Sequence, residues 1–215
     1  MAREFRTGER VLLIDAKRRR YLITLKPDGE FHSHSGFVPH DELIGQPEGC
    51  TVHSTKGNAY LAVRPTLSDF VLKMPRGAQV IYPKDLAPIL MLADIQPGVR
   101  VLESGVGSGA LSMAMLRAGA KENVTSFLGP EVLDRYRVEL RNCYDGIDEQ
   151  DLDRVVLDLP EPWNVVPHAA RAMHPGGIIC AYTPSVVQVM QFREALAGSP
   201  FDMPETLEVL HRTWH

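Results

Sequence analysis

The stretch from residue 101 to residue 111 combines one acidic residue with closely spaced glycines. It reads Val-Leu-Glu-Ser-Gly-Val-Gly-Ser-Gly-Ala-Leu, so Glu103 precedes Gly105, Gly107 and Gly109. An apolar strand followed by such a loop and a helix brings backbone N–H groups to the carboxyl edge of a parallel sheet, where open α/β folds bind ligands. Because a pyrophosphate would not favour a carboxylate so near, the pattern indicates a different nucleotide-like ligand. The alternative is an ordinary strand-to-helix turn that binds no ligand.

A second stretch, Asp158-Leu-Pro-Glu-Pro-Trp163, begins at the carboxyl end of a strand expected over residues 154–158. In a parallel sheet this end faces the same crevice as the glycine loop, so Asp158 could point at a reacting atom. Pro160 and Pro162 fix φ and remove two backbone donors, which makes the turn stiff. A carboxylate and an aromatic ring in one turn could contact and stack on a nucleobase. The alternative is a strand-terminating turn with Trp163 in the core.

The histidines and cysteines indicate no metal site. His32, His34 and His40 lie in a β-rich region without a carboxylate or cysteine partner at ligand spacing, so we expect a structural role for them. The 3 cysteines lie far apart and form no CxxC pair. Neither a disulfide framework nor a zinc site is therefore expected, and the cysteines are interpreted as buried or incidental thiols.

The elements that must position these residues fall into two groups. Over residues 1–65 we expect a small antiparallel β domain, with turn signals between strands at residues 10–15, 20–25 and 59–63. Over residues 66–215 strands alternate with helices, which predicts an α/β domain with a doubly wound, mostly parallel sheet. The expected helices are 69–73, 86–93, 110–118, 165–173 and 186–197, and the expected strands are 99–103, 136–140, 154–158, 178–182 and 206–210.

Composition excludes several classes of protein. With 44% hydrophobic and 23% charged residues among 215, the chain can bury an ordinary core. No apolar window approaches the ~18 residues of a spanning helix, and charges occupy the start, so we expect a cytoplasmic protein without a membrane contact. Residues 1–100 carry 14 Lys and Arg against 11 Asp and Glu, whereas residues 101–215 carry 9 against 16. The basic run at residues 17–20 is a candidate for phosphate contacts, with a solvated turn as the alternative.

The two stretches resemble a known family when they are combined with the segment from Met74 to Asp85. The acid followed by GxGxG resembles the first motif of class I S-adenosylmethionine (AdoMet) methyltransferases. The blocks Tyr82-Pro-Lys-Asp85 and Asp158-Leu-Pro-Glu-Pro-Trp163 resemble the tRNA (adenine-N1)-methyltransferase family that modifies the T-loop adenine, adenine 58. The resemblance runs nearly end to end and is strongest with bacterial and archaeal members.

The resemblance implies a fold, a reaction and a site. It implies a Rossmann-like sheet, AdoMet (S-adenosyl-L-methionine) as cofactor, tRNA as substrate and a homotetramer. Asp158 would be the catalytic residue, facing both the cofactor and adenine N1, and Tyr82 and Trp163 would wall the adenine pocket. The residues that would bind the cofactor are Gln79, Glu103, Gly105, Gly107, Ser108, Gly109, Ala110, Leu111, Asn142 and Asp158. Asn142 stands where many methyltransferases have an acid near the adenine ring.

Two parts of the family pattern lack a counterpart. The helix over residues 110–118 leads into residues 121–128, which read as another helix, so the second strand and its ribose-binding acid are absent. The chain stops at His215, where the family continues into its last strands. We therefore expect residues to be missing between Arg117 and Glu122 and after His215, with a Cα separation well above ~3.8 Å at the first of these places. A continuous peptide there would indicate a truncated relative.

Two other functions remain open from the sequence. One is a non-catalytic tRNA-binding subunit, as occurs in the family's eukaryotic heteromers, although the retained glycine loop and Asp158 argue against it. The other is a methyltransferase for a small molecule, which the amino-terminal β region and the family-specific blocks disfavour. Methyl transfer from labelled AdoMet to unmodified tRNA distinguishes these functions.

Overall fold

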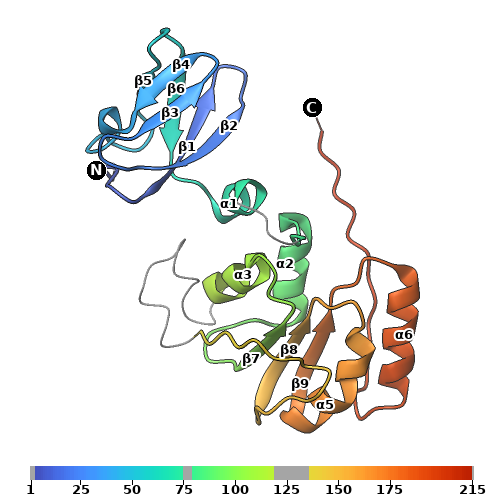
Figure 1. The fold of residues 1–215 in the computed structure, drawn as a ribbon. Coiled ribbons are helices and arrows are strands. Elements are labelled where there is room, and N and C mark those ends of the chain that lie inside the picture. Colours follow the sequence, from blue (N-terminus) through green and yellow to red (C-terminus); the bar gives the residue numbers. More distant parts are fainter. Residues whose placement is uncertain (1–2, 75–78, 119–135, 215) are drawn as a thin grey trace. The chain divides into compact units, whose positions relative to one another are not determined.

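The computed structural model describes residues 3–74, 79–118 and 136–214 (Figure 1). The chain divides into two compact units, Met1–Pro75 and Arg76–His215, which we describe one at a time. A domain boundary at residue 65 stays a prediction. The interruption expected between Arg117 and Glu122 and the helix expected over residues 121–128 fall on residues 119–135, which lie outside the described residues.

The first unit is an antiparallel β structure, as predicted. One sheet has the strand order β2-β1-β6-β5, and β3 and β4 form a separate hairpin. The strands are β1 (Arg10–Asp15), β2 (Arg20–Thr24), β3 (Glu30–Ser33), β4 (Gly36–Pro39), β5 (Thr51–His53) and β6 (Ala59–Val63), with a short 3-10 helix η1 (His40–Glu42) after β4. Alternate side chains of these strands share one core, which contains Val11, Leu13, Val38, Tyr60 and Ala62. This unit ends with α1 (Leu67–Lys73), whose amino terminus is closed by a capping box between Thr66 and Asp69.

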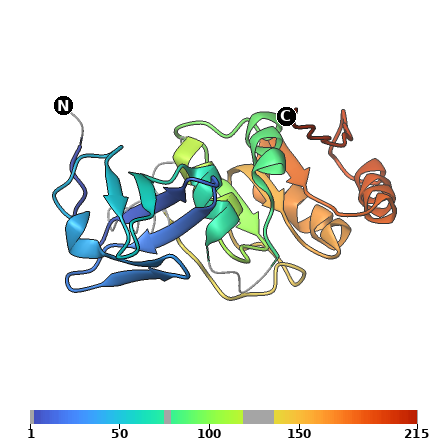
Figure 2. The same cartoon turned by 90° about the horizontal axis from the view of Figure 1, so that it is seen from above.

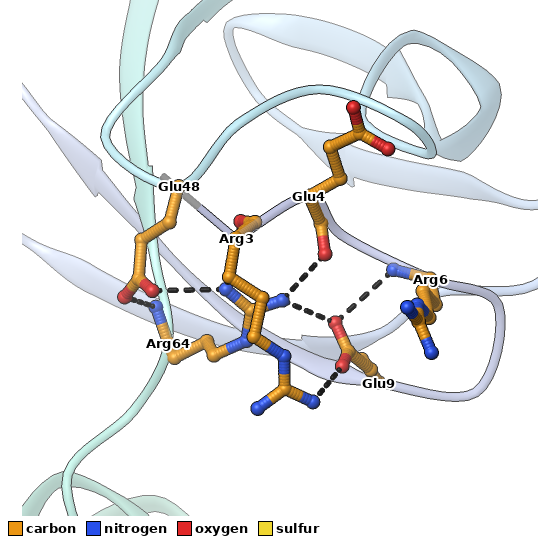
Figure 3. Close-up of polar contacts among 6 residues, drawn as sticks. All are labelled: Arg3, Glu4, Arg6, Glu9, Glu48 and Arg64. Atoms are coloured by element: carbon orange, nitrogen blue, oxygen red, sulfur yellow. Dashed lines mark hydrogen bonds and ion pairs between the residues drawn. The ribbon is translucent and has the colours of Figure 1, made fainter. Parts of the chain in front are cut away.

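Arg64 ties the end of β6 to the amino-terminal segment (Figure 3). Its guanidinium donates to Oε2 of Glu48 over 2.9 Å, to Oε2 of Glu9 over 2.7 Å and to the carbonyl oxygen of Glu4 over 2.7 Å. Arg3 adds a second cation to Glu9, at 2.9 Å. The side chain of Arg64 is only 19% exposed, so these charge-assisted hydrogen bonds are poorly screened by solvent.

Replacing Arg64 with alanine is expected to destabilise the first unit by about 2 kcal/mol, because it leaves two carboxylates without their main cation. Against the opposing effect of burial, the backbone N–H of Arg6 and the hydrogen bonds and charge of Arg64 hold the pKa of Glu9 below the usual value. The backbone N–H, side-chain hydrogen bond and charge of Arg64 likewise lower the pKa of Glu48. The stability that the two ionised carboxylates contribute is therefore present above the ordinary glutamate pKa. It is lost as the pH falls through the lowered pKa values. Native-state hydrogen exchange of the β1 and β6 amides measures the effect. Arg64→Lys should lose less of this protection than Arg64→Ala. Equal protection in Arg64→Ala and the wild type would refute the stabilising role of Arg64.

The second unit contains a parallel sheet, which agrees with the expected fold class (Figure 1 and Figure 2). The sheet order is β7-β8-β9, from β7 (Val101–Ser104), β8 (Leu152–Leu157) and β9 (Met173–Ala181). Both strand pairs are parallel. The helices are α2 (Pro83–Leu92), α3 (Ala110–Ala118), α5 (Val166–Ala172), preceded by the 3-10 helix η3 (Pro162–Val165), and α6 (Val186–Ala197).

The central strand β8 is covered on both faces. Val155 and Leu157 point to one face and pack with Ala169 and Ala172 of α5. On the other face the buried Arg154 donates to the carbonyl oxygen of Ala93, directly after α2, over 2.7 Å. Apolar side chains fill most of the buried positions of β8, and the buried guanidinium of Arg154 is accommodated by this hydrogen bond.

Two expected strands are absent from the second unit. Residues 136–140 and 206–210 form neither helix nor strand, and Leu140 and Leu210 are strongly exposed. Their apolar and β-branched residues are typical of strands, but this propensity gives a strand only where a sheet edge accepts the backbone hydrogen bonds. The elements α2 and β9 begin three or more residues earlier than expected. The helix α2 begins at Pro83, which suits the first helical turn, and β9 begins at Met173 and crosses a register irregularity.

Candidate functional site

The carboxyl ends of the three parallel strands are joined by backbone hydrogen bonds. Ser104 at the end of β7 accepts a hydrogen bond from the N–H of Asp158, over 2.9 Å. Leu157 at the end of β8 accepts one from the N–H of Tyr182, over 2.9 Å. The residues that follow each strand therefore lie along one edge of the sheet, as predicted for the glycine loop and Asp158.

The glycine loop passes directly against the backbone of Asp158. Gly105 has φ +96°, and a Cβ at this residue would lie 2.0 Å from the carbonyl oxygen of Asp158. Only glycine fits a position with both constraints. Gly107 and Gly109 also have positive φ, at 50° and 78°, and the Gly109 N–H closes the loop onto the carbonyl oxygen of Val106 over 2.7 Å. The close approach, rather than the turn alone, explains why the first glycine is needed.

The helix α3 begins directly after this loop and is firmly packed. Ala110 and Leu111 are each 3% exposed, and Ser108, in the loop before them, is partly exposed. Gly109 accepts the first helical hydrogen bond, from the N–H of Met113 over 2.9 Å. The unpaired N–H groups of a helix start are thus presented at the strand ends, where they can bind a polar or anionic ligand group.

Glu103 places a carboxylate beneath the loop. Its Oε2 accepts the hydroxyl of Ser112, which in turn accepts the hydroxyl of Tyr136 over 3.0 Å. Its Oε1 is buried and has no hydrogen-bond partner among the described residues. Burial, with a contribution from the charge of Asp158 and against the opposing Ser112 hydrogen bond, raises the pKa of Glu103 to about 7. A buried carboxylate with one unpaired oxygen favours a cationic or hydrogen-bond-donating partner.

The raised pKa of Glu103 makes stability depend on pH. Because the folded-state pKa, about 7, exceeds the ordinary 4.5, the folded state binds more protons between these values and loses stability as the pH rises through them. The loss is about 3 kcal/mol once the pH is above the folded value. We expect the unfolding free energy of Glu103→Gln to match that of the wild type near pH ~5 and to exceed it near pH ~8. Urea unfolding at both pH values measures the difference, and an equal gap at both values would contradict it.

Asp158 is held by its backbone while its carboxylate stays unpaired. Burial raises its pKa, and its carboxylate has no hydrogen-bond partner within the described part of the chain. The turn behind it is fixed from two sides. Gln188 of α6 donates to the carbonyl oxygen of Pro160 over 2.9 Å, and the N–H of Glu161 donates to the hydroxyl of Tyr144 over 3.2 Å. A rigid turn that presents an unpaired carboxylate suits a substrate contact.

A further polar cluster at the strand ends was missed by sequence reasoning. Asp85 in the first turn of α2 is 7% exposed and pairs with Lys84 at 2.7 Å. Burial, together with the charge and a hydrogen bond of Asp85, raises the pKa of Tyr182. The available signal was position, because Tyr182 follows the end of β9 as Asp158 follows the end of β8. Tyr182 therefore joins the candidate site.

Asn142 and Gln79 have different surroundings. Asn142 lies in a turn, where its Oδ1 accepts the N–H of Tyr144 over 3.2 Å. Its neighbour Cys143 lies against the end of β7, with the Ser104 hydroxyl 2.9 Å from the Cys143 sulfur. Asn142 is thus adjacent to the strand ends, but its side chain already serves the turn. Gln79 is exposed and directly follows residues 75–78, which are outside the described residues.

The two aromatic candidates lie on different elements. Tyr82 is the residue before α2, and its side chain is 47% exposed. Trp163 is part of η3 and lines a hollow formed with residues of α5 and the end of α6, including Val166, Ala195 and Pro200. Trp163 thus lies beside residues of α5 and α6. The part of the chain that the structure describes contains no group of three metal-ligating residues that could hold an ion. No described helix is long and apolar enough to cross a bilayer.

Comparison with protein families gives two matches. Residues 58–215 match the family described as the tRNA methyltransferase complex GCD14 subunit, and residues 4–52 match the TrmI-like N-terminal family. A tRNA (adenine(58)-N(1))-methyltransferase TrmI from Thermus thermophilus is 36% identical over 95% of this chain and 86% of its own length. A tRNA (adenine(57)-N(1)/adenine(58)-N(1))-methyltransferase TrmI from Methanocaldococcus jannaschii is 30% identical, over 94% of this chain and 84% of its own.

Two solved structures share the fold over nearly the whole chain. A SAM-dependent O-methyltransferase from Thermotoga maritima superposes with a TM-score of 0.90 at 29% identity, covering 98% of this chain and 85% of its own. The tRNA (m1A58) methyltransferase TrmI from Aquifex aeolicus gives a TM-score of 0.79 at 26% identity, with 99% and 89% covered. The two proteins are named for different methyl acceptors, an oxygen in the first and adenine 58 of tRNA in the second.

Proposed function

The chain belongs to the family of the tRNA methyltransferase complex GCD14 subunit, which it matches over residues 58–215, and we propose how its own residues perform the reaction. It is an AdoMet-dependent enzyme that methylates N1 of adenine 58 in tRNA. We propose Asp158 as the catalytic residue. The observation that carries this proposal is the bond from Asp158 N–H to Ser104, which places Asp158 against the glycine loop.

The glycine loop and Glu103 fit the cofactor. AdoMet supplies a methyl group already activated on a sulfonium, together with a cationic amino group. The unpaired buried oxygen of Glu103 suits such a positive group, whereas it would repel a phosphate. We propose that Gly105, Gly107 and the residues at the start of α3 bind the methionine part of AdoMet beside Glu103. Ionisation of Glu103 would then tighten AdoMet binding as the pH rises through about 7.

The remaining cofactor and substrate assignments follow the same division of roles. Ser108, Gly109, Ala110 and Leu111 extend the cofactor contact along the loop and the first turn of α3. Gln79 and Asn142 are proposed as further cofactor contacts, and Tyr82 and Trp163 are proposed as walls of the adenine pocket, all by their position in the family motifs. Tyr182 joins them because it follows the neighbouring strand end.

The chemistry asks the chain mainly for alignment and charge stabilisation. Adenine N1 is a neutral nucleophile, and its methylation makes the ring cationic. A carboxylate at residue 158 can accept a hydrogen bond from the exocyclic N6 and stabilise the developing positive charge. Hydrogen bonds to the backbone of Pro160 and Glu161 hold the turn that carries Asp158, so this backbone needs little reorganisation during the reaction. Extruding the stacked target base costs a few kcal/mol, which tRNA contacts elsewhere on the enzyme must offset.

The oligomer, the domain division and the compartment are proposals that extend the family assignment. We propose a homotetramer, because Val186, Val187 and Met190 of α6 leave an apolar face exposed in the single chain. We also propose a β-rich domain over residues 1–65, a methyltransferase domain over residues 66–215 and a cytoplasmic enzyme. Light scattering of the purified protein gives the molar mass, and a monomer at micromolar concentration would rule out the tetramer.

The test of the function is methyl transfer to a defined tRNA. Labelled AdoMet and an unmodified tRNA transcript should give N1-methyladenosine at position 58, and a transcript with another base there should give none. Label at a ribose oxygen would instead support the O-methyltransferase activity named for the Thermotoga protein. Robust tRNA binding without any transfer would support a non-catalytic subunit.

A further inference from the structure

The two units differ in charge, which raises the question of where a polyanionic tRNA is held. The second unit, which carries the candidate site, has 12 Lys and Arg against 18 Asp and Glu. The first unit has 11 against 9. Because affinity for nucleic acid comes largely from cations that neutralise phosphates, an acidic catalytic unit needs a basic surface elsewhere.

Three turns of the first unit come together and bring several of its exposed cations to one surface. They are the β1–β2 turn, the β3–β4 turn and the β5–β6 turn, and His34 connects them. A guanidinium nitrogen of Arg19 lies 3.2 Å from Nε2 of His34, and Nζ of Lys56 donates to the carbonyl oxygen of His34 over 3.3 Å. The hydroxyl of Ser54 also donates to the carbonyl oxygen of Ser35, over 2.5 Å. We call the exposed residues Lys17, Arg18, Arg19, His34 and Lys56 the basic turn surface.

The one acidic residue in these turns is directed inward and orders the basic ones. Asp15, whose side chain is 8% exposed, accepts the N–H groups of Lys17 and Arg19, each over 2.9 Å, and the Arg19 guanidinium over 2.7 Å. Arg18 has φ 60°, so the turn is a defined left-handed conformation. The side chains of Lys17 and Arg18 form no hydrogen bond or ion pair with any described residue. Cations that are fixed at their backbone and unpaired at their tips are ready to contact phosphates.

We propose that the basic turn surface binds the phosphodiester backbone of the tRNA substrate. The proposal rests on the proposed function for the identity of the RNA. A backbone contact fits better than a base contact, because the surface offers lysine and arginine tips and no exposed Phe, Tyr or Trp among its own residues. The surface supplies a concentration of positive charge, whereas the second unit is acidic overall. Asp158 keeps its proposed role in the methyl transfer.

The test compares two charge-matched double variants. Lys17→Gln/Arg18→Gln removes two cations from the surface. Arg6→Gln/Lys26→Gln removes one arginine and one lysine that are also exposed but lie near the opposite end of β2, where the N–H of Gly8 donates to Leu25 over 2.8 Å. A third variant, Lys56→Gln, probes a different turn of the surface. Binding of unmodified tRNA is measured between about 50 and about 300 mM KCl, a range in which phosphate contacts are salt-dependent.

The surface variants should weaken tRNA binding selectively. We expect Lys17→Gln/Arg18→Gln to bind roughly tenfold more weakly near 0.1 M salt and to lower the salt slope by about 1 to 2, and Lys56→Gln to lower it by about 1. The Arg6→Gln/Lys26→Gln control should stay within about twofold of the wild type, as should kcat at saturating tRNA for every variant. Equal weakening in the control, or unchanged binding in the surface variants, would overturn the proposal. If the variants change tRNA binding as expected but the wild type transfers no methyl group, the proposed activity is wrong, while the basic turn surface remains supported as a tRNA-binding surface.

Discussion

Replacing Asp158 with alanine is expected to slow methyl transfer to tRNA by about a hundredfold to a thousandfold at saturating substrate. Asp158 follows the end of β8, and its backbone is bonded to the end of β7 while its carboxylate stays unpaired among the described residues. The positive charge that develops on the methylated adenine would lose its fixed counter-charge in this variant. Single-turnover transfer of labelled methyl groups from AdoMet measures the loss directly.

Two controls separate a catalytic role of Asp158 from a structural one. Asp158→Asn keeps the size and one acceptor oxygen of the side chain but not its charge. We therefore expect its rate of methyl transfer to lie between those of the wild type and the alanine variant. AdoMet affinity, measured by calorimetry, should change far less than kcat. An alanine variant that methylates tRNA within about threefold of the wild type would remove Asp158 from the catalytic role, since loss of a positioned acid–base group costs at least about a hundredfold.

The second large effect is expected for Gly105→Ala. A Cβ at this residue would lie 2.0 Å from the carbonyl oxygen of Asp158, and φ is +96°. The backbone of the loop or of the Asp158 turn must therefore move, which we expect to cost about 3 kcal/mol or more of unfolding free energy. Because the moved atoms belong to the site, methyl transfer should become undetectable. Urea unfolding and the transfer assay measure the two effects.

Gly109→Ala is the matched control for this substitution. Gly109 is in the same loop with φ +78°, but a Cβ there would meet no heavy atom within 4 Å. Its cost is then the left-handed conformation alone, about 1 to 2 kcal/mol. If Gly105→Ala were no worse than Gly109→Ala, the close approach to Asp158 would not be what requires glycine at residue 105.

The site was predictable to the extent that it follows from local sequence and the topology of parallel sheets. The glycine loop and Asp158 each follow a short apolar strand, and strands of a parallel sheet end at one edge, so their proximity could be expected. Asp85 and Tyr182 were missed because nothing in the sequence near either residue indicates the other. Alongside burial, Asp85 raises the pKa of Tyr182 although the two residues belong to segments far apart in the chain, and only the tertiary structure brings those segments near each other.

The strand predictions failed where the local pattern lacked a partner. The alternation over residues 10–15 and 59–63 became β1 and β6, which pair with each other. Similar apolar content over residues 136–140 and 206–210 gave no strand. Strand formation is a contact between distant segments, so propensity alone cannot decide it.

The family, the cofactor class and the candidate roles of the glycine loop and Asp158 follow from the sequence, because they depend on residue types at fixed spacing. The tertiary structure alone decided the ionisation of Glu103, the backbone contact that requires Gly105, the Asp85–Tyr182 pair and the convergence of three turns into one basic surface. The physical reason is the same in each case. Burial, close approach and charge proximity are set by which distant segments pack together, and a linear pattern does not contain that information.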